Sequence, residues 1–167
     1  MKLRIIITGG TFDKHYDEIK GTLGFKDTHL PEILTAVRCT IPIELEINQL
    51  IDSLEMHSSN RERILASCRA APEERIVITH GTDTMVETAR VLGEARLEKT
   101  IVLTGAMVPY AVTGSDAMFN LGCSVAAVQL LRHGVYIAMS GRVFDWDNVV
   151  KVRERGVFET LHHSPTA

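Results

Sequence analysis

The feature that most constrains this chain is a series of five short aliphatic runs, each rich in Ile, Val or Leu. Several are almost continuously hydrophobic, which is typical of strands buried on both faces of a parallel sheet. The runs cover residues 3–8, 43–47, 76–79, 100–104 and 135–139. Segments with helical apolar spacing lie between them, at residues 30–39, 59–71, 84–97 and 116–132. This alternation predicts an α/β fold, with an open, mostly parallel sheet flanked by helices in a three-layer, Rossmann-like or flavodoxin-like arrangement.

The length of 167 residues, with 45% hydrophobic and 23% charged residues, suits one globular domain. We expect this domain to cover residues 1–161, and residues 162–167 to form a disordered tail. Cys39, Cys68 and Cys123 are widely spaced and form neither a CxxC pair nor a ligand pattern with histidine. They are therefore expected to be reduced thiols, and no metal site is predicted.

The N-terminus runs directly into the first predicted strand, without the long apolar segment and cleavage site of an export signal. No apolar run is long enough to cross a bilayer, and a formal charge of −3 gives no basic field for nucleic acid. We therefore expect a cytoplasmic protein that contacts neither membrane nor nucleic acid. Its expected partners are a small molecule and further copies of itself.

Polar residues follow three of the predicted strands, at the ends where the strands lead into helices. The segments are Thr8-Gly9-Gly10-Thr11, His80-Gly81-Thr82-Asp83-Thr84 and Thr104-Gly105-Ala106-Met107. In open parallel sheets, ligands bind at these carboxyl ends, because the loops converge there and helix N-termini offer free N–H groups. Thr84 and Glu87 fit a capping box, which leaves Thr82 and Asp83 without an evident structural role. The sequence therefore predicts a ligand site at this edge.

Each residue taken alone also has a plainer interpretation. Gly9 and Gly10 could close a tight turn or cradle a phosphate, although neither the G-x-G-x-x-G pattern of dinucleotide sites nor a P-loop sequence is present. Lys151 could be a solvated lysine on an exposed strand, and Ser53 could simply begin a turn. His80 could be a core histidine whose hydrogen bonds are satisfied.

Taken together, the three motifs resemble, in order and spacing, the bacterial-type asparaginase/glutaminase family. The resemblance continues through Gly114-Ser115-Asp116-Ala117-Met118-Phe119-Asn120-Leu121 and Met139-Ser140-Gly141-Arg142-Val143-Phe144-Asp145 to Lys151, and so covers nearly the whole chain. It implies hydrolysis of L-asparagine to L-aspartate and ammonia, with no metal or organic cofactor. It also implies a homodimer or homotetramer, because the family's sites lie at subunit contacts.

The resemblance further implies a role for each matching residue. Thr11 would be the nucleophile that forms an acyl-enzyme, and the second catalytic group would consist of Thr82, Asp83 and Lys151. Because a threonine hydroxyl is a poor nucleophile, a neighbour must promote loss of its proton. Lys151 could do so either as a hydrogen-bond donor that makes a hydroxyl more acidic or as a base. The substrate's α-carboxylate and α-amino group would be held by Ser53 and Asp83, and the site would also be lined by Gly10, Gly81 and Ala106.

The sequence departs from the family pattern in three ways. The family usually has a second, smaller C-terminal domain that supplies an acidic residue to a neighbouring site, and this chain is expected to lack it. Residues 12–18 replace a glycine-rich mobile loop, so that Tyr16 becomes the candidate partner of the nucleophile and Asp17 or Glu18 could replace the missing acid. Leu54 stands where a polar residue usually contacts the substrate's amino group.

Leu54 has a consequence for the expected activity. A leucine cannot accept a hydrogen bond from an ammonium group, and such a loss weakens binding by about 1–3 kcal/mol. We therefore expect weak affinity for asparagine. Two alternatives remain open, namely hydrolysis of a different amide, such as glutamine or D-asparagine, and a small amino-acid-binding protein without turnover. A further alternative, a nucleotide-binding domain, is supported only by the glycine pair Gly9-Gly10.

Overall fold

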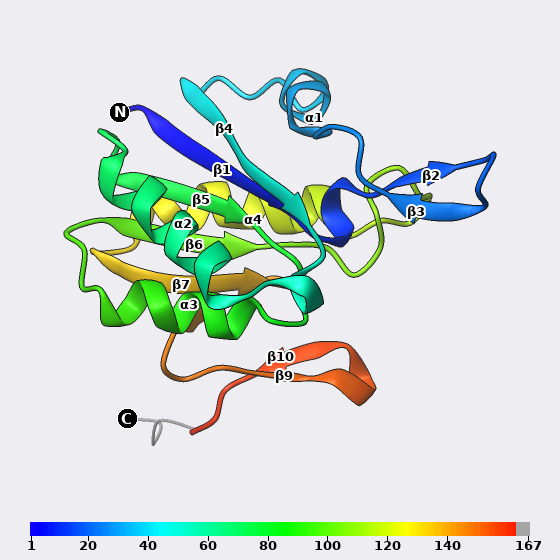
Figure 1. Cartoon of the computed structure of the whole chain (residues 1–167). Coiled ribbons are helices and arrows are strands. Elements are labelled where there is room, and N and C mark those ends of the chain that lie inside the picture. The colour runs from blue at the N-terminus through cyan, green and yellow to red at the C-terminus, as the bar shows by residue number, and fades with distance from the viewer. Residues whose placement is uncertain (163–167) are drawn as a thin grey trace.

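The computed structural model describes residues 1–162, and its centre is a six-stranded sheet with the order β4-β1-β5-β6-β7-β8 (Figure 1). The first five strands in this order are parallel, and β8 pairs antiparallel with β7. The sheet therefore confirms the predicted mostly parallel α/β fold. The strands are β1 (Leu3–Gly9), β4 (Ile43–Ile51), β5 (Arg75–Thr79), β6 (Thr100–Thr104), β7 (Gly134–Met139) and β8 (Arg142–Asp145).

In the described part of the chain, four α-helices cover the two faces of the sheet, which makes three layers (Figure 1). They are α1 (Leu30–Ala36), α2 (Ser58–Ala70), α3 (Met85–Glu94) and α4 (Ala117–Leu130). The interior consists of one cluster on the α2 and α3 side and another on the α1 and α4 side. Along β1, Ile6 enters the first cluster, whereas Ile5 and Ile7 enter the second, because successive strand side chains point to opposite faces.

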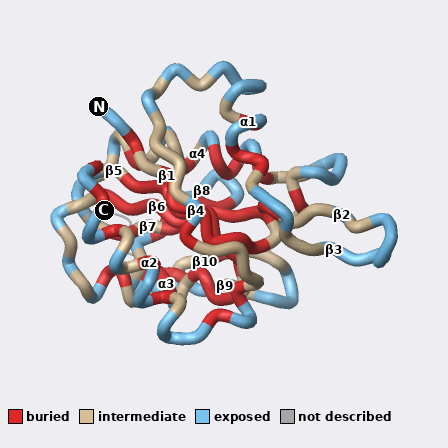
Figure 2. Tube along the Cα trace, turned by 45° about the horizontal axis from the view of Figure 1, so that its top comes forward, coloured by how far each residue is buried: buried red, intermediate tan, exposed pale blue. Residues whose placement is uncertain are grey.

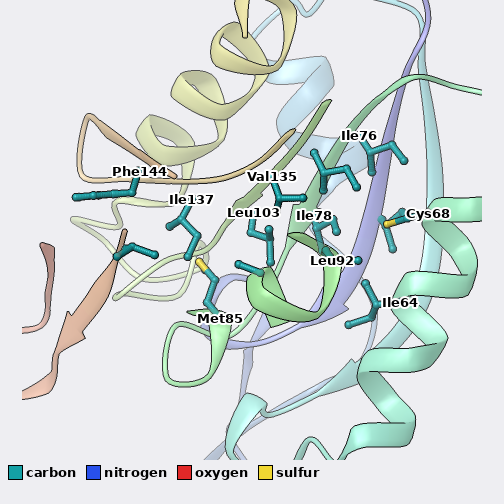
Figure 3. Close-up of a cluster of buried hydrophobic side chains, with 14 of the residues drawn as sticks. Ile64, Cys68, Ile76, Ile78, Met85, Leu92, Leu103, Val135, Ile137 and Phe144 are labelled. Atoms are coloured by element: carbon teal, nitrogen blue, oxygen red, sulfur yellow. The ribbon is translucent and has the colours of Figure 1, made fainter. Parts of the chain in front are cut away.

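Burial explains why the aliphatic runs form the inner strands. Every residue of β6 is buried, and the central residues of β1, β5 and β7 are largely buried, as the tube in Figure 2 shows. Figure 3 shows the α2 and α3 side, where Ile64 and Leu92 of these helices face Ile76, Ile78 and Leu103 of the strands. Each fully buried side chain of this kind stabilises the fold by about 1.5–3 kcal/mol.

Several predicted boundaries differ from the structure by a few residues, and two of the differences have a clear physical cause. Strand β4 extends to Ile51 rather than ending at residue 47, because Ile51 still pairs with Gly9 after an irregularity in the register and its carbonyl accepts from the Gly10 N–H at 3.0 Å. Helix α1 ends at Ala36 rather than continuing to residue 39, because Arg38 adopts a left-handed conformation with φ of 53°. Such a conformation cannot continue a right-handed helix.

The predicted capping box at α3 was wrong. The Thr84 hydroxyl makes no capping bond and instead donates to the Ser53 carbonyl at 2.8 Å. The Glu87 carboxylate accepts from the Arg61 guanidinium at 2.7 Å and so pairs α3 with α2. Thr84 therefore ties the loop after β5 to the turn after β4, which is a structural role at the predicted site edge.

Two small hairpins lie outside the main sheet (Figure 1). The first joins β2 (His15–Asp17) to β3 (Thr22–Gly24) and projects beyond the carboxyl ends of the strands. The second joins β9 (Val150–Val152) to β10 (Val157–Glu159) and lies beside α3. The second hairpin is anchored by Val149 and Phe158, which are buried in the α2 and α3 cluster.

The predicted tail lies mostly outside the described residues, since only His162 of its six positions is described. The His162 backbone N–H and carbonyl both bond to the side chain of Asn148, at 2.8 and 3.1 Å. None of the helices in residues 1–162 combines the length and the apolar character needed to cross a membrane.

Candidate active site

The strand order places the candidate site at a characteristic position of this fold. Counted along the chain, the parallel strands have the order 2-1-3-4-5, which is that of flavodoxin-like sheets. Strand β1 leads to α1 on one face, whereas β5, its neighbour in the sheet, leads to α3 on the other face. Ligands of such sheets bind at the carboxyl ends of these two strands, where the connections diverge. Thr11 follows β1 and Thr82 follows β5, so both lie at this position.

Two glycines bring the ends of β1 and β5 into direct contact. A Cβ atom on Gly10 would lie 2.3 Å from the Gly81 nitrogen and 2.4 Å from its Cα, so only glycine fits. Gly10 also has φ of 78° and ψ of −177°, a conformation that other residues avoid. This contact accounts for the second glycine of the Gly9-Gly10 pair, so no phosphate is needed to explain it. Because Thr11 and Thr82 each follow one of these glycines, their backbones are neighbours.

The turn after β4 joins the same cluster. A Cβ atom on Gly81 would lie 2.5 Å from Ser53 Oγ, so that Ser53 packs directly on the Gly81 backbone. Ser53 is 1% exposed, and the Thr84 bond to its carbonyl holds the turn in place. The structure therefore brings together Gly10, Gly81 and Ser53, three residues predicted from separate parts of the sequence.

Lys151 reaches the end of β5 from the β9–β10 hairpin. Its Nζ donates to Thr82 Oγ1 at 2.8 Å and to Asp83 Oδ1 at 2.7 Å. The Lys151 side chain is 8% exposed, whereas that of Asp83 is 35% exposed, so the lysine is covered and the carboxylate remains open to ligands. Because Thr82 Oγ1 accepts from the ammonium group, its own proton is free to point elsewhere. Lys151 is therefore a contact residue of this cluster rather than a solvated lysine.

Ala106 lies in the loop after β6, which a side-chain network holds in place. Asp116 accepts from the Met107 and Val108 N–H groups, each at 3.0 Å. Asn120 donates to the Gly105 carbonyl at 3.0 Å and accepts from the Ser140 N–H at 2.9 Å. The motif at residues 114–121 thus positions the loop that carries Ala106, which is 1% exposed.

Asp13 was not among the predicted site residues. It is fully buried two positions after Thr11, and its Oδ1 accepts from Thr28 Oγ1 at 2.9 Å and from the His29 N–H at 3.0 Å. Burial is the main cause that raises the pKa of this carboxyl group, while the two hydrogen bonds oppose the rise. Asp13 thereby joins the turn that bears Thr11 to the start of α1. Its sequence signal is weak, because a charged residue after Phe12 looks like the beginning of an exposed loop.

The remaining candidates lie on the rim. Tyr16 is on β2, and 62% of its surface is exposed. Asp17 Oδ1 accepts from the N–H groups of Ile19 and Lys20, so this carboxylate stabilises the hairpin turn. Leu54 is 62% exposed next to the buried Ser53. Their proposed roles toward a substrate remain predictions.

The fold and these contacts define a flavodoxin-like α/β domain whose polar site joins the ends of β1 and β5 to a lysine from a separate hairpin. The sequence matches the family described as "Asparaginase, N-terminal" over residues 2–167, and the chain belongs to this family. This confirms the resemblance drawn from the motifs.

Individual relatives agree with the family match. The L-asparaginase of Thermococcus kodakarensis is 29% identical over all of this chain and 53% of its own length, and its structure superposes with a TM-score of 0.86. A probable cytoplasmic L-asparaginase from Campylobacter jejuni superposes with a TM-score of 0.78 at 31% identity, over 91% of this chain and 50% of that one. L-asparaginase 2 of Escherichia coli is 36% identical over 53% of this chain and 27% of its own. The chain thus spans about half the length of the relatives it matches from end to end, and less of the others.

Proposed function

We propose that the protein is an amidohydrolase that converts L-asparagine to L-aspartate and ammonia. The observation that carries this proposal is the contact of Lys151 with Thr82 and Asp83 at the end of β5, next to the turn that bears Thr11. Membership of the asparaginase family supports the same reaction. The proposal needs no metal and no organic cofactor.

In the proposed reaction, Thr11 Oγ1 attacks the side-chain amide carbon of asparagine and gives up its proton. The carbonyl oxygen becomes an oxyanion, which nearby backbone N–H groups stabilise. Collapse of this intermediate breaks the C–N bond, and the leaving nitrogen takes up the proton that Thr11 gave up, passed on through Thr82, to depart as ammonia. Water then attacks the acyl-enzyme ester, which releases aspartate and restores the Thr11 hydroxyl. Tyr16, if the β2–β3 hairpin folds over the site, would contact Thr11 during these steps.

Lys151 is assigned the role of hydrogen-bond donor. Both of its contacts are with oxygen atoms that accept, and the bond to Thr82 leaves the Thr82 proton free to be passed on. Donation to Thr82 stabilises negative charge on that oxygen, which makes the hydroxyl a better proton donor to the leaving nitrogen. Asp83 holds Lys151 in this position.

The substrate's α-groups would bind on the same edge. The Asp83 carboxylate is open enough to pair with the α-ammonium group, and Ser53 would meet the α-carboxylate at the contact between the turn after β4 and Gly81. Gly10, Gly81 and Ala106 would line the site through their backbones. Because Leu54 offers no acceptor for the ammonium group, we expect a high KM, and a micromolar KM would contradict this assignment.

The test is ammonia release by the purified protein from L-asparagine, L-glutamine and D-asparagine. Thr11→Ala and Thr82→Val should abolish turnover of L-asparagine, whereas Thr35→Ala, a matched hydroxyl loss on the exposed face of α1, should leave it unchanged. Full activity of both site variants would refute the assignment. Turnover of only one of the other two amides would redirect the proposal to that substrate.

A second candidate function is the binding of a small amino acid without turnover. It is favoured by the exposed Leu54 beside Ser53, an apolar group at the expected ammonium position. Absence of ammonia release from all three amides, together with a rise in melting temperature on addition of aspartate, would support it. The same measurement with a nucleotide tests the nucleotide-binding alternative.

We also propose a homodimer or homotetramer, which light scattering of the purified protein would test. The three free cysteines suit a reducing compartment and support the proposed cytoplasmic location. Relatives carry names of both kinds, since the Campylobacter protein is called probable cytoplasmic and one from Haemophilus influenzae probable periplasmic. Fractionation of the source cells would decide between the two compartments.

A further inference from the structure

His80 is a buried titratable residue to which the proposed reaction gives no part. It is the first residue after β5, it is 0% exposed, and both of its ring nitrogens have partners. Nδ1 lies 2.8 Å from the Gly81 carbonyl oxygen, and Nε2 lies 2.8 Å from Thr88 Oγ1 on α3. Burial lowers the pKa of His80 to about 4, so the ring is neutral near pH 7.

These partners allow only one arrangement of the ring protons. A carbonyl oxygen can only accept, so Nδ1 must carry the hydrogen that reaches Gly81. The neutral ring then has a lone pair on Nε2, which accepts from the Thr88 hydroxyl. The Gly81 carbonyl thus fixes the tautomer, and the Thr88 hydroxyl adapts to it as the donor to Nε2.

The bond to Gly81 determines the orientation of the next peptide group. The Gly81 carbonyl is drawn toward the buried ring of His80, and a trans peptide is planar with its C=O and N–H on opposite sides. The Thr82 N–H therefore points away from the interior. Within residues 1–162, no acceptor is found for this N–H.

The surroundings of Gly81 explain why a positioning bond is needed. Glycine has no Cβ to restrict its backbone, so the Gly81–Thr82 peptide could otherwise rotate. The contacts with Gly10 and Ser53 bear on Gly81 itself, and Gly105 packs against the His80 carbonyl, where a Cβ would lie 2.4 Å away. Within residues 1–162, the Gly81 carbonyl accepts a side-chain hydrogen bond from His80, and this bond bears on the direction of the Thr82 N–H.

We propose that His80 is a positioning residue that, through the Gly81 carbonyl, aims the Thr82 N–H at the oxygen on which negative charge develops. The inference rests on the proposed amide hydrolysis, because this oxygen is the substrate carbonyl oxygen in that reaction. His80 itself does not touch the substrate. The bound product aspartate would place a carboxylate oxygen at the same donor.

Two substitutions separate the two bonds of His80. In His80→Asn, the amide nitrogen stands close to the place of Nδ1 and can still donate to Gly81, while the contact with Thr88 is lost. In His80→Gln, the terminal amide stands close to the place of Nε2. It can keep the hydrogen bond with Thr88, but the bond to the Gly81 carbonyl is lost. We expect His80→Asn to retain kcat within a few-fold and His80→Gln to lower it about 10²-fold with little change in KM, as for loss of one oxyanion donor.

Thr88→Val is the structural control, since it removes a buried hydrogen bond on the far side of the ring. It should lower the melting temperature at least as much as His80→Gln but leave kcat near that of the unchanged protein. If loss of kcat instead follows loss of stability through all three variants, or if His80→Gln retains kcat, the positioning role is overturned.

A second measurement separates this inference from the proposed function. Aspartate added to ¹⁵N-labelled protein should shift the Thr82 amide resonance, and His80→Gln should abolish that shift. Turnover of asparagine without a shift would uphold the amidohydrolase and overturn the role of His80. A shift that depends on His80 without turnover would uphold the positioning of the N–H and overturn the hydrolysis.

Discussion

Replacement of Gly10 by alanine tests whether the contact between the ends of β1 and β5 creates the site. The backbone at φ of 78° and ψ of −177° is open essentially to glycine alone, which costs alanine about 1–3 kcal/mol. The new methyl group would also lie 2.3 and 2.4 Å from two Gly81 backbone atoms, where about 3.5–4.0 Å is needed. The loops must separate by more than an ångström, and we expect the free energy of unfolding to fall by about 3–5 kcal/mol in total.

Gly21→Ala provides the matched control. Gly21 has a positive φ of 65°, but nothing lies within 4 Å of the position that its Cβ would occupy. Its substitution should cost only the conformational part, about 1–2 kcal/mol. Urea unfolding followed by circular dichroism measures both losses. Gly10→Ala should also lower kcat about 10²-fold in the folded protein, because Thr11 moves relative to Thr82. Equal stability losses in the two variants would refute the contact argument.

Three further predictions concern charged groups. Lys151→Met should reduce ammonia release by about 10²–10⁴-fold, as for loss of a proton-transfer group, and retention of more than a tenth of the activity would contradict the assignment. The pKa of His80 falls from 6.5 to about 4 on folding, so the unfolded chain binds more protons than the folded one between these pH values. The contribution of the neutral His80 to the free energy of unfolding is therefore fully present above pH 6.5 and is lost as the pH falls toward 4. The loss approaches about 3 kcal/mol, and urea unfolding of His80→Asn over this range should lack that component. Asp13→Ala should destabilise the fold by about 1–3 kcal/mol, because it removes the bonds from Thr28 and His29. Asp13→Asn should cost less, because its Oδ1 can still accept both bonds. Equal losses on thermal unfolding would show that these two bonds are unimportant.

The sequence was sufficient to predict the five parallel strands and four helices because their signal is local. A run such as residues 100–104 is apolar at every position, and the structure buries all five. The position of the site followed from the fold, since the residues after β1 and β5 must share an edge of the sheet. Thr11, Thr82 and Lys151 were predicted as site residues through the family motifs, and the contact of Lys151 with Thr82 joins residues far apart in the chain.

Other features depended on contacts that no local pattern encodes. Thr84 has the sequence of a helix cap, but its hydroxyl finds the Ser53 carbonyl in a different loop. Asp13 lies in a polar stretch, yet it is buried because α1 begins directly over it. The last residues of β4 are less regular in hydrophobicity, and they remain a strand because they pair with the end of β1. In each case a long-range hydrogen bond outweighs the local preference.

The separate hairpin that carries Lys151 has a consequence for how the protein loses activity. Within residues 1–162, strands β9 and β10 pair only with each other, so their detachment breaks none of the hydrogen bonds of the six-stranded sheet. The hairpin is held to the interior by apolar side chains such as Val149 and Phe158, and by the bonds of Lys151 to Thr82 and Asp83. Such a segment can open in a sub-global fluctuation at a lower free energy than the sheet. Heat inactivation should therefore precede melting, with the lysine withdrawn from its partners while the rest of the domain remains folded.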